Sequence, residues 1–505
     1  MSIKSFAARI FASVVHKQTL AWARNPIAVQ EKVFKKLLEV AGNTAFGKAH
    51  SFKNIQNHTD FTQHVPVRDY EALRPFIDRV VAGESDVTWP GKPLYFAKTS
   101  GTTSGAKYIP LTKESMPEHI KAARNAILSY IYESGNSHFV DGKMIFLQGS
   151  PEMETKNGIQ LGRLSGIVAH YVPNYLQKNR MPSWETNCID DWETKVEAVI
   201  DETLPESMSV ISGIPSWVQM YFERIVQRTG KKVGEVFPDF NLFIYGGVNF
   251  EPYKPRFEQL IGRKVDSIEL FPASEGFFAY QDTRTQLGML LLLDAGIFYE
   301  FIPADRFYEE NAPRLTIGEV AIGVNYALII STTAGLWAYN IGDTVAFTST
   351  KPYRVVVTGR LKHYISASGE HVIGKEVETA MQQTAAIHNL VINEFTVAPQ
   401  LETTAGELPH HEWFIELGAQ NLNVELAAIA TTLDKQMREQ NSYYDDLIVG
   451  KVLQPLKITV VPQNGFQQYM KTIGKLGGQN KLPRLSNDRK IAQVLSEIVT
   501  DSLRY

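Results

Sequence analysis

The sequence predicts an α/β protein with a large N-terminal domain, residues 1–360, and a small α+β C-terminal domain, residues 361–505. The chain of 505 residues exceeds the size at which one hydrophobic core usually stops growing. Up to about residue 285, short apolar runs alternate with amphipathic stretches, which is typical of a largely parallel sheet. Beyond it the runs follow one another with Gly/Asp turns, which predicts a β-rich subdomain of antiparallel strands.

The first expected element is an amphipathic helix in MSIKSFAARIFASVVHKQ, where Lys4 and Arg9 interrupt the apolar run. We expect its apolar face to dock on the protein's own domain. That face contains Ile3, Phe6, Ala7, Ile10, Phe11 and Val14. Binding to a membrane surface is the alternative, and the small positive charge of the polar face disfavours it. A second helix, NPIAVQEKVFKKLLEVAGN, is expected to end at Gly42-Asn43.

The remaining elements follow in order. Buried strands are expected at 94–97, 144–148, 209–212, 242–245 and 267–271, with helices in ESMPEHIKAARNAILSYIYES and SWVQMYFERIVQRTG. Antiparallel strands are expected in GMLLLLDAGIFYEFIP, GEVAIGVNYALIIST, LWAYNIGDTVAFTS and YRVVVTGR. Past residue 360 the pattern predicts a helix, two strands, a helix and a strand, which together form the small C-terminal domain.

Composition excludes several classes of function. The formal net charge is -3 and the basic residues are scattered, so we expect no nucleic-acid partner. No run of 18 uncharged apolar residues exists, so no stable membrane insertion is expected. The single cysteine, Cys188, cannot form an internal disulfide, which suits a cytoplasmic location. The oligomeric state cannot be read from the sequence.

The first candidate site is the stretch TSGTTSGAK, from Thr99 to Lys107. Its glycines let backbone N–H groups approach a ligand, its hydroxyls donate hydrogen bonds and Lys107 adds a charge, which suits a polyphosphate. It does not fit the P-loop pattern GxxxxGK[ST]. Ser104 and Lys107 do satisfy SxxK, a weak indication of a serine acyl-transferase. A mobile Ser/Thr/Gly turn is the third interpretation.

Two further candidates directly follow expected buried strands, where ligands gather in open α/β sheets. Gly246 and Gly247 would let a flat ligand lie against the backbone, although a plain turn explains them equally well. In FPASEG, Phe271 could stack on a base, Ser274 could touch phosphate and Glu275 could ligate Mg²⁺. The alternative for FPASEG is a helix N-terminus capped by Ser274, which taken alone is the better interpretation.

The last candidates are charged. Asp343, expected on a hairpin turn of WAYNIGD, could accept both hydroxyls of a ribose, or could be an ordinary turn residue. Arg360 and Lys362 lie in TGRLKHY, at the expected domain junction. Near the C-terminus, KTIGKLGGQNKLPRLSNDR is expected to form one loop that could carry a lysine into a site when the small domain closes.

The order of these motifs resembles the adenylate-forming superfamily, which includes acyl-CoA synthetases and firefly luciferase. SGTTSG followed by KxIP, FPASEG, YNIGD and GGQNKLPR look more closely like the auxin-responsive acyl acid–amido synthetase family of plants and its bacterial relatives. The resemblance covers essentially the whole chain. Each motif alone is weak, but six in the right order are a strong indication. The hinge reads GRLKHYI, so His363 stands where acyl-CoA synthetases carry a carboxylate.

The resemblance implies ATP and Mg²⁺ as cofactors, and a small carboxylic acid and an amine, such as an amino acid, as substrates. The implied phosphate-binding residues are Ser100, Gly101, Thr102, Thr103 and Lys107. Gly246, Gly247 and Phe271 would frame adenine, Ser274 would hold the α-phosphate, Glu275 would hold Mg²⁺, and Asp343 with Arg360 would take the ribose. The implied catalytic residues are Lys481, chosen from its NKxPR context with Lys475 as second choice, and Lys362 at the hinge.

The expected activity is therefore an AMP-forming ligase: a carboxylate attacks the α-phosphorus of ATP, and an amine then attacks the acyl-adenylate. The same first step followed by transfer to the thiol of coenzyme A is the nearest alternative. A catalytically inactive nucleotide-binding interaction protein is another, and the presence of Glu275, Asp343 and Lys481 argues against it. Nothing in the sequence identifies the acid, the amine or the residues of the acyl pocket.

Overall fold

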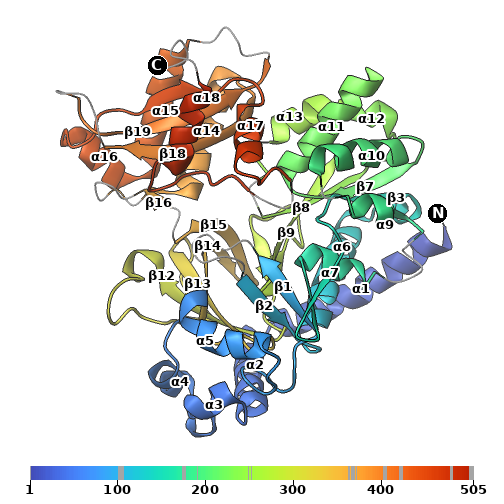
Figure 1. Cartoon of the computed structure of the whole chain (residues 1–505), viewed down its shortest axis with the longest axis vertical. Helices are drawn as coiled ribbons and strands as arrows, with labels where there is room; N and C mark the ends of the chain where they lie inside the picture. Colours follow the sequence, from blue (N-terminus) through green and yellow to red (C-terminus); the bar gives the residue numbers. More distant parts are fainter. Residues whose placement is uncertain are drawn as a thin grey trace. The chain divides into compact units, whose positions relative to one another are not determined.

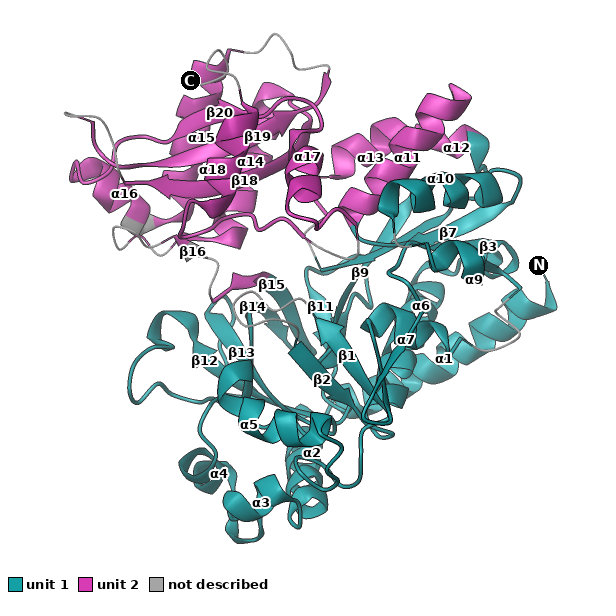
Figure 2. Ribbon diagram, viewed as in Figure 1, with its two compact units in different colours: residues 1–214, 236–247, 265–357 teal, residues 215–235, 248–264, 358–505 magenta. Residues whose placement is uncertain are grey.

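The computed structural model describes residues 2–99, 107–172, 178–189, 191–247, 250–251, 253–361, 364–365, 370, 372–401, 407–419, 425–477 and 481–499. Its contacts divide the chain into two compact units (Figure 2). Unit 1 comprises residues 1–214, 236–247 and 265–357, and unit 2 comprises residues 215–235, 248–264 and 358–505. The chain therefore passes back and forth between the units before residue 358. The predicted domains 1–360 and 361–505, and closure of one on the other, stay predictions.

Unit 1 is built on a mixed sheet (Figure 1), to which the described residues contribute eleven strands in the order β12-β13-β14-β15-β11-β10-β9-β8-β7-β3-β6. Their bounds are β3 (Lys143–Phe146), β6 (Arg180–Met181), β7 (Met208–Ser212), β8 (Leu242–Gly246), β9 (Asp266–Ala273), β10 (Gly276–Tyr280), β11 (Met289–Leu291), β12 (Ile297–Pro303), β13 (Asn325–Thr332), β14 (Tyr339–Thr350) and β15 (Tyr353–Arg360). The strands from β6 to β9 pair in parallel, whereas β9–β10, β10–β11, β11–β15, β13–β14 and β12–β13 are antiparallel. The expected strands at 144–148, 209–212, 242–245 and 267–271 and the expected antiparallel strands are confirmed and belong to one sheet, whereas the strand expected at 94–97 lies in a separate sheet.

Helices cover the parallel strands. Side chains of α1 (Ile3–Ala23) and α6 (Met116–Ser134) share a core cluster with residues of β7, β8 and β9. Ile131, Val210 and Leu242 of this cluster are buried. Removing each such side chain from water stabilises the fold by about 1.5–3 kcal/mol. The other helices of unit 1 are α2 (Pro26–Ala41), α3 (Ala45–Ala49), α4 (His58–His64), α5 (Tyr70–Val81), α7 (Leu164–Ala169), α9 (Trp184–Asn187) and α10 (Trp192–Thr203).

The predicted N-terminal helix α1 forms, but the prediction of which of its faces docks on the protein is wrong. Ile3 and Phe6 are 89% and 55% exposed, and Ile10, Phe11 and Val14 are exposed with them. The buried residues of the helix are Ser5, Ala12, Val15 and Thr19. These side chains are small, which lets α1 lie close to α6. The Ser5 hydroxyl contributes a hydrogen bond of 2.9 Å to the carbonyl of Ser137.

The burial of the small-residue face of α1 leads to a prediction about stability. Enlarging Ala12, which is 1% exposed, to leucine is expected to lower the free energy of unfolding by about 1–3 kcal/mol, because the added methylenes have no space. Phe6→Ser, on the exposed face, is expected to change it by no more than about 0.5 kcal/mol. Urea unfolding of both variants measures the difference. A larger loss in Phe6→Ser than in Ala12→Leu would mean that the predicted face was right.

A smaller sheet of unit 1 has the order β2-β1-β5-β4. Its strands are β1 (Tyr95–Thr99), β2 (Lys107–Leu111), β4 (Glu154–Lys156) and β5 (Ile159–Gly162). β1 and β2 are antiparallel, and Thr99 pairs with Lys107. The candidate phosphate-binding stretch therefore joins two paired strands.

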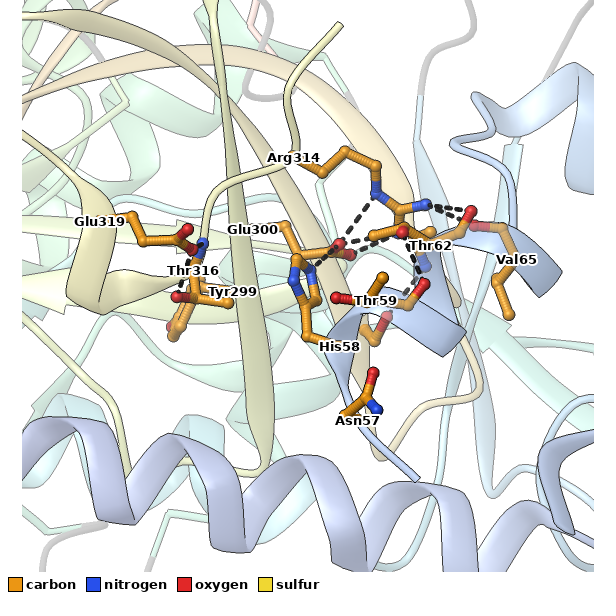
Figure 3. Close-up of polar contacts among 12 residues, drawn as sticks. Asn57, His58, Thr59, Thr62, Val65, Tyr299, Glu300, Arg314, Thr316 and Glu319 are labelled. Carbon is orange, nitrogen blue, oxygen red and sulfur yellow. Dashed lines mark hydrogen bonds and ion pairs between the residues drawn. The ribbon is translucent and has the colours of Figure 1, made fainter. Parts of the chain in front are cut away.

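A buried charge cluster ties α4 to β12 (Figure 3). Glu300 of β12 has an exposed fraction of 0%, and Figure 3 shows Arg314 and His58 pointing at it. Arg314 Nε and Nη2 donate to its two carboxylate oxygens at 2.9 and 2.8 Å, and His58 Nε2 lies 2.8 Å from Oε1. Arg314 Nη1 also donates to the carbonyl of Val65 at 2.6 Å. Burial raises the pKa of Glu300, but the Arg314 charge and the hydrogen bonds outweigh it and leave the pKa below its ordinary value.

Unit 2 contains the predicted α+β element order. The strands β18 (Ile392–Gln400), β19 (His410–Leu417) and β20 (Lys457–Val460) form a sheet in which β18–β19 is antiparallel and β19–β20 parallel. The helices pack in two separate core clusters. The first contains residues of α14 (Gly374–His388), α15 (Leu426–Gln440) and α16 (Ser442–Val449), and the second contains residues of α17 (Gly465–Thr472) and α18 (Lys490–Ile498). Trp413 belongs to the first and its neighbour Phe414 to the second, as the alternation of a strand requires.

Helices from earlier in the chain complete unit 2. They are α11 (Pro215–Thr229), most of α12 (Val233–Val236) and α13 (Lys254–Ile261). A short pair of strands, β16 (Tyr364–Ile365) and β17 (Val372–Ile373), precedes α14. Across the described residues of both units, no helix combines the length and the apolar character that crossing a bilayer requires.

Candidate functional site

The candidate phosphate-binding residues Ser100, Gly101, Thr102 and Thr103, together with Ser104, lie outside the described residues. The structure does place the ends of their stretch. Lys107 begins β2, and its Nζ lies 5.6 Å from the centre of the Tyr70 ring on α5. The Tyr70 hydroxyl accepts a hydrogen bond of 2.9 Å from the backbone N–H of Tyr108. Lys107 is thereby held half-buried at the base of the hairpin.

Gly246, the last residue of β8, and Gly247, which follows it, are glycines for different structural reasons. Gly246 pairs with Leu270 of β9, and a Cβ at Gly246 would lie 2.6 Å from the Leu270 carbonyl oxygen. No other residue fits there without displacing β9. Gly247 has φ +84°, in the left-handed region that favours glycine, and it is exposed. At this carboxyl end of two parallel strands, Gly246 is half-buried and Gly247 is exposed.

Ser274 and Glu275 form the two-residue turn of the β9–β10 hairpin, in which Ala273 pairs with Gly276. The alternative of a helix N-terminus capped by Ser274 is wrong, because the strand after the turn folds straight back on β9. Both turn residues are half-buried. Phe271 lies at the same end of β9, and its ring packs edge-to-face on Phe278 with 5.0 Å between centroids. Only 6% of Phe271 is exposed.

Asp343 was expected on a hairpin turn, and that prediction is wrong, because the residue lies inside strand β14. Thr344 pairs with Ala327 and Asn340 pairs with Ile329, so the residues between them bulge opposite Leu328 alone. Gly342 permits the bulge with φ +86°, and its N–H donates to Asn340 Oδ1 at 2.8 Å. A bulge re-aims the neighbouring side chain, and Asp343 is half-buried there.

Of the three C-terminal lysines expected in one loop, Lys471 lies instead in the last turn of α17. Lys475 and Lys481 are both exposed between α17 and α18, and Lys481 begins the described segment 481–489. That segment runs along β18: the Thr396 hydroxyl donates to the Pro483 carbonyl at 2.7 Å. Backbone hydrogen bonds of 3.0 Å link Val397 to the residues that flank Leu485. Lys481 is thus carried on a segment that the sheet of unit 2 holds in place.

Arg484, a residue to which the sequence assigned no role, anchors this segment. Its guanidinium is 11% exposed, pairs with Glu394 and donates to Glu378 Oε1 at 3.2 Å. Arg484 Nη2 also donates to the hydroxyl of Tyr253 at 2.8 Å, and Tyr253 is the residue directly before α13. Burial alone would lower the pKa of Arg484, but Glu394, Tyr253 and Glu378 raise it above its ordinary value. The only sequence signal was its place in KLPR.

The candidate residues therefore fall into groups. Gly246, Phe271, Ser274 and Glu275 share the end of β8, β9 and β10 in unit 1. Lys107 and Asp343 are in unit 1 on other strands, and Arg360, exposed at the end of β15, is in unit 2 with Lys481. Lys362 and His363 lie outside the described residues.

The described candidate residues offer few ligands for Mg²⁺. Within the described ranges, no three His, Cys, Asp or Glu side chains gather as a metal cage. Mg²⁺ that arrives with a nucleotide needs only one or two carboxylates beside the phosphates and water. Glu275, on a tight turn at the strand ends, meets that requirement, so the residues fit the metal in its nucleotide-bound form.

Comparison with known proteins places these features in a family. Models of the GH3 family N-terminal, central and C-terminal domains match residues 15–196, 290–360 and 375–490. Jasmonoyl–L-amino acid synthetase JAR4 of Nicotiana attenuata is 21% identical over 558 aligned residues, which cover 94% of each chain.

Two solved structures share the fold. The AtGH3.15 acyl acid amido synthetase in complex with 2,4-DB superposes with a TM-score of 0.79 at 17% identity, over 97% of this chain and 96% of that one. The 2-hydroxyisobutyryl-CoA ligase in its postadenylation state with 2-HIB-AMP gives 0.61 at 13% identity, over 94% and 92%. The large mixed-sheet domain, the smaller C-terminal domain and the resemblance seen in the sequence are thereby confirmed, and the chain belongs to the GH3 family.

Proposed function

We propose that this protein is an AMP-forming acyl acid–amido synthetase, which activates a carboxylic acid with ATP and transfers the acyl group to an amine. The observation that carries the proposal is the ordered match of all three GH3 domain models along the chain. It is supported by a relative named as an L-amino acid synthetase that aligns over 94% of both chains. The order of the motifs from TSGTTSG to NKLPR is consistent with it.

In the first step a carboxylate oxygen attacks the α-phosphorus of ATP, and the bond to pyrophosphate breaks. The difficulty is the approach of an anion to a polyanion, so the protein must supply positive charge and N–H donors. Ser100, Thr102 and Thr103 would donate to the phosphates, and Lys107 would add a charge beside them. Ser274 would hold the α-phosphate. Bound at Glu275, Mg²⁺ would neutralise charge on the phosphate oxygens.

Other residues would orient the two reactants. Asp343, at the bulge of β14, and Arg360 would take the ribose, while Gly246, Gly247 and Phe271 would frame the adenine. Lys481 would bridge the carboxylate and the α-phosphate, where charge develops in the transition state. Lys362 would serve the hinge between the two half-reactions.

In the second step the neutral amine attacks the carbonyl carbon of the acyl-adenylate. The C–N bond forms, the bond to AMP breaks, and the amine nitrogen loses a proton. Water must be kept out, because it would hydrolyse the activated acyl group.

The test is acid-dependent release of pyrophosphate from ATP, measured over a panel of aliphatic and aromatic carboxylic acids. We expect at least one acid to stimulate release, and an amide product when a mixture of amino acids is added. If no acid stimulates release, the protein is not an adenylating enzyme. If coenzyme A yields a thioester and no amino acid yields an amide, the acceptor assignment is wrong and the activity is that of an acyl-CoA ligase.

A further inference from the structure

Unit 2 contains a cavity of about 350 Å³ that the proposed ATP-binding residues do not line. Its walls come from α11, α13, the facing ends of β18 and β19, and α17 with the segment after it. Apolar side chains form much of the lining: Trp217, Met220, Leu260, Phe466, Met470 and Leu482. Leu482 directly follows Lys481, so the cavity lies beside the segment that carries the proposed catalytic lysine.

Two residues that line the cavity carry a buried amide oxygen to which no described residue donates a hydrogen bond. These oxygens are Gln219 Oε1 and Asn393 Oδ1. The nitrogen ends of these amides face carboxylates: Gln219 Nε2 donates to Glu223 at 3.4 Å, and Asn393 Nδ2 to Glu416 at 3.2 Å. This fixes the orientation of each amide and leaves the oxygen as the unsatisfied atom. Gln219 is 8% exposed, so bulk water does not readily satisfy it.

The charges of the lining are also unbalanced. Glu223 pairs with Arg256 at 2.9 Å, and Glu394 pairs with Arg484. Glu416 is 5% exposed and accepts backbone N–H groups of Asn464 and Phe466 at the start of α17. Among the residues that the structure describes, none places a basic nitrogen within ion-pair distance of Glu416. A buried carboxylate without a cation is costly, and it favours a ligand that brings one.

We propose that this cavity binds a primary ammonium group carried on a compact apolar body. An ammonium offers three N–H donors and a positive charge, which match amide oxygens and a carboxylate. The apolar walls match a hydrocarbon body, and the volume limits it to a small molecule. Burial raises the pKa of Glu416, and a bound cation would oppose that effect. Resting on the proposed function, the ligand is the acceptor amine, held beside Lys481 before it meets the acyl-adenylate.

Direct binding tests the cavity without any reaction. Calorimetry on the full chain would compare 3-methylbutylamine, L-leucine and L-leucinamide with 3-methylbutan-1-ol, which has the same apolar body and no charge. We expect the amine to bind at least about tenfold more tightly than the alcohol. Glu416→Gln and Gln219→Leu are each expected to weaken amine binding about tenfold or more. The matched control is Glu425→Gln, an exposed glutamate of the same unit that does not line the cavity, and it should bind as wild type does.

Two variants are needed because Glu416 also accepts N–H groups of α17, so its replacement could disturb that helix. Gln219 lies on α11, and Gln219→Leu leaves those hydrogen bonds intact. The inference is overturned if the alcohol binds as tightly as the amine. It is also overturned if Gln219→Leu, with wild-type melting temperature, binds the amine unchanged.

Kinetics separates this inference from the proposed function. Pyrophosphate release needs acid and ATP but no amine, so both variants should retain it while the KM for the amine rises. Normal pyrophosphate release with an unchanged KM for the amine would overturn the acceptor assignment and leave the synthetase standing. Amine binding in a protein that no acid stimulates to release pyrophosphate would overturn the synthetase and leave the ammonium site standing.

Discussion

Lys481→Ala is expected to slow acid-dependent pyrophosphate release by about 10²–10³-fold, or roughly 3–4 kcal/mol in the barrier, with little change in ATP affinity. The expected size follows from the role: a preorganised positive contact that strengthens only as charge develops stabilises the transition state more than the bound substrates. The lysine is exposed, and its segment is held along β18 and anchored by Arg484, so its backbone is fixed within unit 2. Single-turnover pyrophosphate release and nucleotide titration measure the two quantities.

The matched control is Lys475→Ala, which removes the same charge from an exposed position after α17. It should release pyrophosphate at the wild-type rate. If Lys475→Ala is slow and Lys481→Ala is not, the catalytic role moves to Lys475. If ATP affinity falls as far as the rate in Lys481→Ala, the residue binds the ground state and does not act in the transition state.

Arg314→Met is expected to lower the free energy of unfolding by about 3–5 kcal/mol, the largest stability effect we predict. Glu300 is fully buried, and Arg314 donates to both of its oxygens. Removing the guanidinium leaves the carboxylate with His58 and no permanent positive charge. The same variant loses the hydrogen bond to the Val65 carbonyl, so the end of α4 is also released from β12. Urea unfolding of the full chain measures the loss.

The control is the double variant Arg314→Met with Glu300→Leu, which removes the buried charge together with its partner. It should recover much of the lost stability, since replacing both partners by apolar groups is often neutral. A double variant no more stable than Arg314→Met would mean that the loss comes from the Val65 contact and not from the unpaired carboxylate.

The same cluster fixes the sign of a pH dependence. The folded pKa of Glu300 lies below its unfolded value, so its contribution is present above an unfolded pKa of about 4.3 and is lost as the pH falls through the folded pKa. The wild-type protein should therefore lose more stability on acidification below about pH 4 than Glu300→Gln does.

Much of the fold could be predicted because its strands are short apolar runs between turn residues. The failure at α1 shows the limit of such counting. Periodicity selects the face with the largest apolar side chains, but the packing of α1 against unit 1 buries the small residues Ser5, Ala12 and Thr19 instead. Which of the two faces of α1 is buried depends on the surface against which the helix packs, and that surface is formed by residues distant in the sequence.

The candidate site was partly readable for a similar reason. Glycines and short polar motifs at strand ends, such as Gly246 and Glu275, are local signals. The partners of Arg484 are not, since Tyr253 lies 231 residues away in the chain. Glu300 is an intermediate example. A single acidic residue within the apolar run IFYEFIP indicates a buried charge, but the sequence does not identify the residue that pairs with it.

The interleaving of the two units has a consequence for recombination between relatives. A chimaera that joined residues 1–360 of one GH3 protein to residues 361–505 of another would look like a clean exchange of domains. It would instead pair the Arg484 of one parent with the Tyr253 of the other, and the cavity proposed to bind an ammonium group would combine lining residues from both parents. An exchange that moves residues 215–235 and 248–264 together with the C-terminal part would keep both intact. Under the proposal made above, the segments that determine the choice of acceptor in this protein are discontinuous in the sequence.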